Sequence, residues 1–432
     1  METIKSTGQR PRVLDGVRVV DLSHILAGPY CARILCDLGA EVIKVEPVIT
    51  GELSRSVNLH YWWFSNYGKK GLSLDLTKPE GLQIIKDLIM KSDVVVDNFR
   101  AGIMEKLGLS YDNLKKINPR LIACSITGFG QYGPNRDLPA TNPVANVMSG
   151  LSWWQGQISR DDKRPTNVGF AIADTSTGVH AAVAICAALY YREQTGQGQY
   201  IDICLLDSLV SINDKLQRFI LDEMEVEQLF SRRSGQQTDT DNLIYAAKDG
   251  YMVVQPATQE QWVSLARAMG KPELIDDKRF SAPLSRSENM TELNGIISNW
   301  VSQHSSRREV LDILERAGVI CAPILSYHEA INQPHMSAHD MIVEAEDPER
   351  GMLKVINTPY NFSDTDSGLR GRLPRLGEHN VEILATILGY SDKRIAELYE
   401  KGVIYSDLSG YTLEEVLKME RERCRPEFRS NQ

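Results

Sequence analysis

Residues 17–46 read VRVVDLSHILAGPYCARILCDLGAEVIKVE, which is the pattern of a strand, a helix and a second strand. The β-branched run Val17–Leu22 is typical of a buried strand. Pro29 fits the first turn of a helix, which we expect over residues 30–38. The run Glu41–Glu46 then predicts the next strand. Because a helix between two strands lets them run parallel, this stretch predicts a parallel sheet covered by helices.

The same alternation of β-branched runs and amphipathic stretches continues through the first half of the chain. Further strands are expected at 72–76, 93–99, 121–128 and 199–205. Further helices are expected at 79–92, 111–117 and 175–192. The predicted fold class is therefore α/β.

The rhythm changes after Asp207, and a chain of 432 residues is long for a single core, so we expect two domains. A large domain is predicted over 1–222. A smaller α+β domain is predicted over 223–344, with a hairpin at Tyr245–Gln255. The C-terminal segment, 345–432, returns to mixed strand and loop and ends in a charged amphipathic helix.

Composition argues against several kinds of partner. The net charge of −9 disfavours nucleic acid and an anionic membrane surface. The seven cysteines form no CxxC pair, which indicates reduced thiols in a cytoplasmic protein. The most apolar run, 178–191, is shorter than the roughly 20 residues that a membrane-spanning helix needs. His335 and His339 lack an HExxH pattern and a third ligand, so no metal site is expected.

The loop His24–Pro29 follows the first predicted strand and precedes a helix N-terminus, which is a natural place for a phosphate or carboxylate. Glu46 closes the second strand, where a dinucleotide-binding domain has its ribose-binding acid. The loop nevertheless has one glycine and lacks the G-x-G-x-x-G pattern. An ordinary strand–helix–strand unit therefore explains the loop better than an NAD-linked oxidoreductase does.

Two further places carry possible chemistry. Asn98, Phe99 and Arg100 follow a strand at the same edge of the sheet, and an amide, an aromatic ring and a guanidinium can hold an adenine and a phosphate. Such a trio is also common in turns. Asp174 precedes the helical run that starts at Thr175, and its plainest interpretation is a helix N-cap. Because its neighbours are apolar, the carboxylate would be desolvated yet stabilised by the helix dipole, as a nucleophile requires.

Taken in order, these segments make the chain similar to the class III CoA-transferases, the family of formyl-CoA and carnitine CoA-transferases. The resemblance covers about residues 13–405. It rests on LDGVRVVDLSHILAGP, LGAEVIKVEP, GELSR, GKKGLSLDL-TKPEG, SDVVVDNFRAGIMEKLGL, NPRLIACSITGFGQYGP, ADTSTGVHAAVAICAALYYREQTGQGQYIDICLLDS and RLPRLGEH.

The resemblance implies an acyl-CoA and a small organic carboxylate as substrates, no prosthetic group, and Asp174 as the nucleophile of a covalent anhydride and thioester relay. It implies CoA contacts at His24, Ala27, Lys69, Asn98, Phe99, Lys106 and Leu107, with Arg100 adding charge. It also implies a Rossmann-like large domain completed by both chain ends, a small domain, and an interlocked homodimer.

The chain departs from this family's patterns at several positions. The related acyl-CoA racemases need a histidine where this chain has Thr141, so racemase activity is disfavoured. Formyl-CoA transferases carry an acid near Asn142, a glutamine at Leu26 and a glycine run near Gly235. These differences, with Trp62, Trp63 and Trp153, favour a bulkier or less polar carboxylate than formate or oxalate. A CoA-binding paralogue without activity, in which Asp174 only caps its helix, is a further alternative.

Overall fold

The computed structural model describes residues 10–159, 162, 164–220 and 243–407. The chain divides into two compact units, one of residues 1–152, 167–212 and 334–432, the other of residues 153–166 and 213–333. The predicted domain boundary at 222, the segment around Gly235 and the predicted C-terminal helix lie outside the described residues. Each unit is described by itself below.

The first unit contains a six-stranded parallel sheet in the order β3-β2-β1-β4-β5-β6. Its strands are β1 Arg18–Asp21, β2 Glu41–Glu46, β3 Lys70–Ser73, β4 Val94–Asp97, β5 Ile122–Thr127 and β6 Tyr200–Cys204. This is the strand order of the Rossmann fold, and the predicted α/β class is confirmed. The order reverses between β1 and β4, so the loops after these two strands diverge and leave a crevice.

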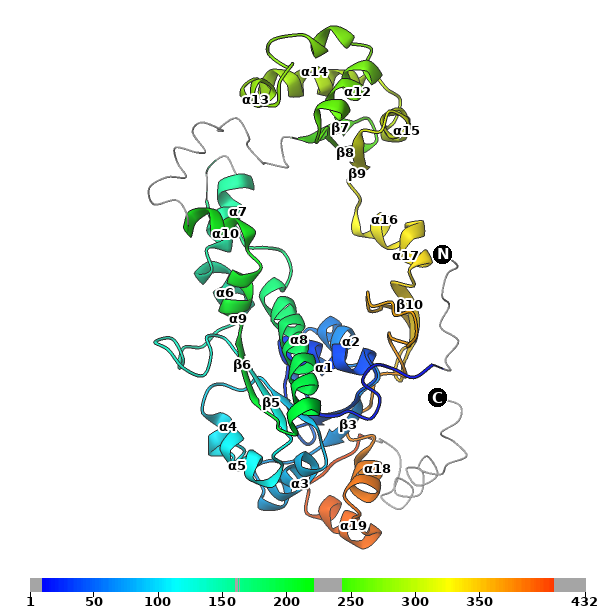
Figure 1. The fold of residues 1–432 in the computed structure, drawn as a ribbon. Helices are drawn as coiled ribbons and strands as arrows, with labels where there is room; N and C mark the ends of the chain where they lie inside the picture. Colours follow the sequence, from blue (N-terminus) through cyan, green and yellow to red (C-terminus); the bar gives the residue numbers. More distant parts are fainter. Residues whose placement is uncertain (1–9, 160–161, 163, 221–242, 408–432) are drawn as a thin grey trace. The chain divides into compact units, whose positions relative to one another are not determined.

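Helices cover both faces of this sheet (Figure 1). Val19 and Val96 face a core shared with α1 (Ala27–Asp37) and α8 (Ile172–Thr195). Val20 and Val95 face a core shared with α3 (Pro79–Met90), α5 (Tyr111–Ile117) and α19 (Asp392–Glu400). Alternate side chains of a strand point to opposite faces, and here both faces are apolar because both are covered. The other helical elements in this part of the first unit are η1 Leu53–Arg55, α2 Leu59–Ser65, α4 Ile103–Lys106, α6 Asn142–Met148 and α9 Leu205–Ser211.

Two helices begin earlier than predicted. Helix α1 starts at Ala27, so Pro29 is its third residue rather than its first. Helix α8 starts at Ile172, which places Asp174 inside the first turn and not at the N-cap. A side chain from another element explains the second difference, because the Ala173 N–H donates to Asn142 Oδ1 at 2.8 Å. Such a long-range cap cannot be recognised from the residues just before the helix.

The third predicted strand, 72–76, is also displaced, because β3 pairs with β2 over 70–73. Leu74 instead forms an isolated bridge with Ile404 of the C-terminal segment. The last stretch of the first unit begins earlier than this predicted segment, at Pro334, and contains the hairpin of β10 Ile342–Asp347 and β11 Gly351–Ile356. Its helical elements are α17 Pro334–Ala338, α18 Asn380–Glu382, η4 Ile383–Ile387 and α19 Asp392–Glu400.

The motif RLPRLGEH, residues 372–379, fastens the C-terminal segment to β3. The Gly71 N–H donates to His379 Nδ1 at 3.0 Å, and the His379 N–H donates to the Gly71 carbonyl at 3.0 Å. Gly377 has a φ of +66°, and a Cβ there would lie 1.9 Å from the Tyr405 carbonyl oxygen. Glycine is therefore required at this position by both conformation and space.

The second unit pairs a three-stranded antiparallel sheet, β7-β8-β9, with a helical layer. Trp262, Phe280 and Trp300 lie in its own core. The predicted hairpin is present as β7 Ile244–Ala247 and β8 Gly250–Gln255. The other elements are α7 Leu151–Ser159, which belongs to this unit from Trp153 on, α10 Asp214–Ile220, α12 Gln259–Ala268, η3 Pro272–Ile275, α13 Pro283–Glu288, α14 Met290–Ser302, α15 Arg307–Arg316, β9 Ile320–Pro323 and α16 Tyr327–Ile331.

Among the described helices, α8 alone has the length and composition of a possible membrane span, and 44% of its most apolar window is buried within the protein. Ala181, Ile185 and Ala188 are fully buried in the core that α8 shares with α1. A core helix has this pattern of burial.

Candidate active site

The crevice between β1 and β4 is held by one amide side chain. Asn98, in the loop after β4, donates from Nδ2 to the His24 carbonyl at 2.7 Å and accepts from the His24 N–H at 2.9 Å through Oδ1. Both ends of the Asn98 amide are therefore used to fix the loop after β1. The resemblance implied that Asn98 contacts CoA, and the structure gives it this additional role.

Buried charged side chains also hold the loop after β1 through hydrogen bonds from the protein interior. Asp21 accepts from the Ser23 N–H at 3.0 Å and from Lys69 Nζ at 2.8 Å, and Lys44 Nζ donates to the Ser23 carbonyl. Burial alone would raise the pKa of Asp21, but Lys44 and Lys69 outweigh burial and lower this pKa to about 2. The carboxylate therefore stays ionised and paired.

Lys69 differs from the other predicted CoA contacts in its placement. Its side chain is fully buried, and Nζ also donates to the Pro29 carbonyl at 2.8 Å and to Asn66 Oδ1 at 2.9 Å. It lines neither of the two cavities described next. In this structure Lys69 supports the loop and the start of α1 from inside the protein.

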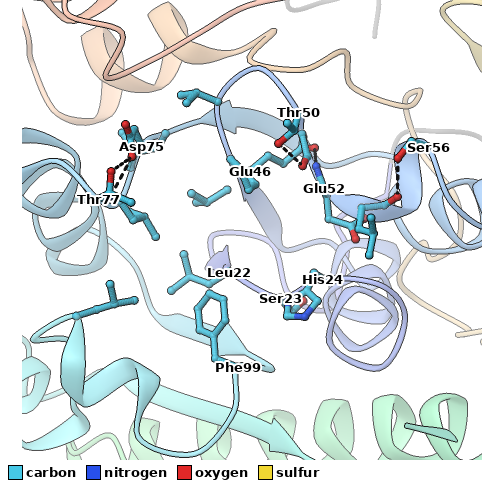
Figure 2. Close-up of a pocket in the computed structure, with 18 residues that line it drawn as sticks. Leu22, Ser23, His24, Glu46, Thr50, Glu52, Ser56, Asp75, Thr77 and Phe99 are labelled. Atoms are coloured by element: carbon cyan, nitrogen blue, oxygen red, sulfur yellow. Dashed lines mark hydrogen bonds between the residues drawn. The ribbon is translucent and has the colours of Figure 1, made fainter. Parts of the chain in front are cut away.

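A cavity of about 550 Å³ lies on one side of His24. Figure 2 shows Leu22 and Phe99 on one side of this cavity. Facing them are Glu46 at the end of β2 and Thr50 and Glu52 on the loop that follows. Its other apolar walls come from Val45, Val48, Leu53, Leu74, Leu76 and Leu107. A largely apolar cavity with a few polar groups suits a planar ring better than a phosphate.

A second cavity, of about 490 Å³, contains Asp174. The predicted contacts that line it with Asp174 are His24, Ala27, Asn98, Phe99, Arg100 and Lys106. His24 and Phe99 line both cavities, so the two adjoin. The structure thus brings the predicted site residues together around two adjoining cavities, with Lys69 as the exception and Leu107 only in the first.

Asp174 is a partly buried carboxylate without a hydrogen-bond or ion-pair partner among the described residues. Burial raises its pKa to about 6. At pH 7 most of the molecules therefore carry the ionised form, and no neighbouring side chain competes for its lone pairs. An ionised carboxylate in this state is a stronger nucleophile than a fully solvated one.

His24 stands between the cavities as a neutral imidazole. Burial lowers its pKa, and the nearby Lys44 ammonium lowers it further, against the opposing effect of Glu52 and Asp21. Its ring centroid lies 5.9 Å from that of Phe99, in a tilted contact. At neutral pH the ring can therefore contact an apolar or amide-containing chain without adding charge.

Sequence reasoning missed two basic or polar contributors to the Asp174 cavity. Arg136, in the loop after β5, lines this cavity, and its guanidinium is paired only loosely, at 3.6 Å from Asp137. Asn142 also lines it while capping α8. The sequence indicates Asn142 only as a departure from a family pattern, and nothing in the local sequence marks Arg136.

Trp62 and Trp63, which the sequence analysis associates with a bulkier carboxylate, have other contacts. Trp62 is buried with the Arg55 guanidinium 3.8 Å above its ring, and Arg55 in turn pairs with Glu46. Trp63 donates from Nε1 to Asp347 at 2.9 Å. Neither tryptophan lines the Asp174 cavity. The ion pair with Arg55 also engages the carboxylate of Glu46. A dinucleotide-binding domain would use an acid at this position to bind a ribose.

Known proteins are similar to this chain over most of its length. A family model described as CoA-transferase family III matches residues 14–380. A succinyl-CoA–D-citramalate CoA-transferase of Chloroflexus aurantiacus is 33% identical over 92% of this chain and 100% of its own. A formyl-CoA:oxalate CoA-transferase of Streptomyces avermitilis is 32% identical over 91% of this chain and 100% of its own.

Solved structures agree as well. A CaiB/BaiF family protein from Brucella suis superposes with a TM-score of 0.74 at 31% identity, covering 88% of this chain and 100% of that one. The resemblance predicted from the sequence is confirmed, and the chain belongs to CoA-transferase family III, whose members are CoA-transferring enzymes.

Proposed function

We propose that this enzyme moves CoA from an acyl-CoA to a carboxylic acid through covalent intermediates on Asp174. The observation that carries the proposal is a partly buried, unpartnered carboxylate, with its pKa raised to about 6, in the cavity at the sheet's switch point. An aspartate that only capped a helix would have its oxygens on backbone N–H groups. No such bond to Asp174 is present among the described residues.

In the first half of the relay, CoA moves from the donor acyl group to the carboxyl group of Asp174. An Asp174 oxygen attacks the thioester carbonyl carbon, the carbon–sulfur bond breaks, and CoA leaves as a thiolate. The thiolate then attacks the Asp174 carbonyl carbon of the mixed anhydride. This attack forms an aspartyl–CoA thioester and releases the donor acid as its carboxylate.

The second half repeats these steps in reverse with the acceptor. The acceptor carboxylate attacks the aspartyl thioester and gives a second mixed anhydride with free CoA thiolate. The thiolate attacks the acceptor's acyl carbon, which forms the new acyl-CoA and restores the Asp174 carboxylate. Each step exchanges one acyl bond for another, so no external source of free energy is needed. The cavity must exclude water, because water would hydrolyse the anhydride and thioester intermediates.

CoA fits the two adjoining cavities as one extended molecule. Its adenine suits the apolar cavity beside Phe99 and Leu107, and its phosphates suit the basic groups Arg100, Lys106 and Arg136. The neutral His24 and the adjoining Ala27 then border the pantetheine chain on its way to Asp174. This arrangement delivers the sulfur end of CoA to the nucleophile.

The acceptor class follows from the relatives. The similar enzymes act, by name, on succinyl-CoA with D-citramalate and on formyl-CoA with oxalate. We therefore propose a dicarboxylic acid as donor or acceptor. A bulkier monocarboxylate is the second candidate, because Asn142, which lines the Asp174 cavity, stands near the position where formyl-CoA transferases carry an acid.

We also propose a cytoplasmic homodimer, with a large CoA-binding domain over 1–222 and a small domain over 223–344. Helix α8 supports the dimer, because it exposes the apolar side chains of Val183 (63%), Tyr190 (69%) and Tyr191 (48%) on the side away from its core. Contiguous exposed apolar residues of this kind mark an association surface. Light scattering should give twice the chain mass.

A product screen tests the proposed activity. Each of several acyl-CoA donors is mixed with each of several carboxylates, and the acyl-CoA products are identified by mass spectrometry. The proposal expects a new acyl-CoA only when both substrates are present, and no exchange of the donor α-hydrogen in heavy water. Exchange of the α-hydrogen without CoA transfer would indicate that the enzyme is a racemase. The Asp174→Asn variant should still bind CoA and form no product.

A further inference from the structure

The loop after β1 contains a conformation that its sequence disfavours. Ile25 has a φ of +69°, in the left-handed region, although it is a β-branched residue. For such a side chain this backbone conformation is a strained outlier, and it persists only where neighbouring groups enforce it. Ile25 lines the cavity that contains Asp174.

Two side chains hold the peptide that joins His24 to Ile25: Asn98 donates to its carbonyl at 2.7 Å, and a buried carboxylate accepts from its N–H. The Ile25 N–H donates to Glu52 Oε1 at 2.7 Å, and Glu52 is only 3% exposed. The same oxygen accepts from the Ser54 N–H at 3.1 Å, while Oε2 accepts from the Ser54 hydroxyl. Glu52 is itself fixed, because its own N–H donates to Glu46 Oε2 at 3.0 Å.

Helix capping alone does not explain the Glu52 contacts. Glu52 is the N-cap of η1 and fulfils that role through Ser54. Its bond to Ile25 reaches 27 residues back along the chain, and it is the shorter of the two N–H bonds to Oε1. Glu52 also lines the apolar cavity, whereas Ile25 lines the Asp174 cavity. One side chain therefore ties the wall of one cavity to the wall of the other.

We propose that Glu52 is a positioning residue for CoA transfer: it holds Ile25 in the left-handed conformation, and so sets where His24 and Ala27 stand relative to Asp174. This inference rests on the proposed function. Without the Glu52 acceptor, Ile25 relaxes to a negative φ and the start of α1 turns away from the nucleophile. CoA still binds, because the basic groups on the loops after β4 and β5 are untouched.

The test compares variants that separate the hydrogen bond from folding. Glu52→Ala should lower kcat by about tenfold or more while KM for acyl-CoA changes by less than about threefold. Glu52→Gln keeps an oxygen acceptor for the Ile25 N–H and should restore most of kcat. Ile25→Gly added to Glu52→Ala should also recover activity, because glycine adopts a positive φ without strain.

Ser54→Ala is the matched control, because it removes a partner of Oε2 and leaves the Ile25 bond in place; its kcat should stay within about twofold of wild type. The inference is overturned if Glu52→Ala keeps wild-type kcat, if Glu52→Gln is as damaging as Glu52→Ala, or if Ile25→Gly gives no recovery. If Glu52→Ala does not fold, Glu52→Ala/Ile25→Gly is tested by itself: it should fold and keep kcat within about threefold of wild type, and a double variant that is unfolded or inactive overturns the inference.

A second readout does not depend on turnover. Hydrogen exchange of the peptide over residues 22–28 should be faster in Glu52→Ala and near wild type in Glu52→Gln and Ser54→Ala. If the wild-type enzyme transfers no CoA, the proposed function fails while this readout still decides whether Glu52 holds the loop. Unchanged exchange in Glu52→Ala would contradict the inference whatever the activity.

Discussion

At the scale of single residues, two buried carboxylates of the site have different neighbours and therefore different pKa values. Asp21 lies between two lysines and has its pKa lowered to about 2, whereas Asp174 has no partner among the described residues and has its pKa raised to about 6. Burial acts on both, so the difference comes from neighbouring charges. Asp21 is therefore a structural ion, and Asp174 is the group available for chemistry.

The pH dependence of turnover should report Asp174. Only its ionised form attacks a thioester, so activity should be lost as the pH falls through about 6 and be constant above it. The measurement is kcat/KM for an acyl-CoA between pH 5 and pH 8. A profile that stays flat down to about pH 5 would show that Asp174 is not the titrating group.

Replacing Asp174 should also stabilise the fold. Its folded-state pKa is raised from 3.8, so ionisation opposes folding at every pH above that value. Asp174→Asn removes this cost and should raise the free energy of unfolding at pH 7 by about 1 kcal/mol. Urea unfolding at pH 7 measures the change. A less stable variant would indicate that the carboxylate is paired in the native enzyme.

At the scale of elements, the N-termini of α1 and α8 border the same cavity, and a close contact holds the two helices together. Gly178 of α8 lies against α1, where a Cβ would be 2.9 Å from the Ala27 carbonyl oxygen and 3.0 Å from the Tyr30 ring. Helix packing at this distance requires glycine. Helix α8, which contains Asp174, is therefore packed rigidly against α1, which follows the His24 loop.

Gly178→Ala should separate these helices. We expect a loss of about 1–3 kcal/mol in the free energy of unfolding, measured in urea, because the new methyl group meets backbone atoms that cannot move independently. Gly169→Ala is the control, since no atom lies within 4 Å of the Cβ position there. Equal stability of the two variants would contradict the close packing of α1 and α8.

The capping residue of α8 offers a test of the cavity's charge. Asn142→Asp keeps the oxygen that accepts the Ala173 N–H and adds a carboxylate to the cavity of Asp174. Like charges raise the pKa of a carboxyl, so the acid limb of the pH–rate profile should move to higher pH by about one unit. An unmoved limb would mean that the two side chains do not interact.

At the scale of the whole molecule, the C-terminal segment completes the first unit through β3. His379 accepts the Gly71 N–H as an unprotonated imidazole, and burial lowers its pKa. The unfolded chain therefore binds more protons than the folded chain below the ordinary histidine value of about 6.5. Stability from this contact is complete above that pH and declines as the pH falls.

The urea midpoint of wild type should fall between about pH 7 and pH 5 more steeply than that of His379→Gln. His24 has a lowered pKa for the same reason of burial and contributes to both proteins, so the difference between the two slopes isolates His379. Parallel pH profiles would contradict the account of this contact.

The sequence predicted the alternation of strands and helices well, because both faces of the sheet are apolar and β-branched runs mark each strand. It also predicted that the His24 loop and Phe99 lie at one edge of the sheet, since carboxyl ends of parallel strands meet there, whereas the role of Asp174 was implied by the family resemblance. It could not predict Glu52 holding Ile25, or Asn142 capping α8. Both depend on hydrogen bonds between segments far apart in the chain, which local patterns do not record.

Trapping the covalent intermediate tests the central claim most directly. The enzyme is incubated with an acyl-CoA and no acceptor, treated with hydroxylamine, digested, and analysed by mass spectrometry. Hydroxylamine attacks an aspartyl thioester or anhydride at the Asp174 carbonyl, so the account predicts a hydroxamate on Asp174 and none in Asp174→Asn. A hydroxamate on another residue, or none with any donor that supports turnover, would contradict the relay.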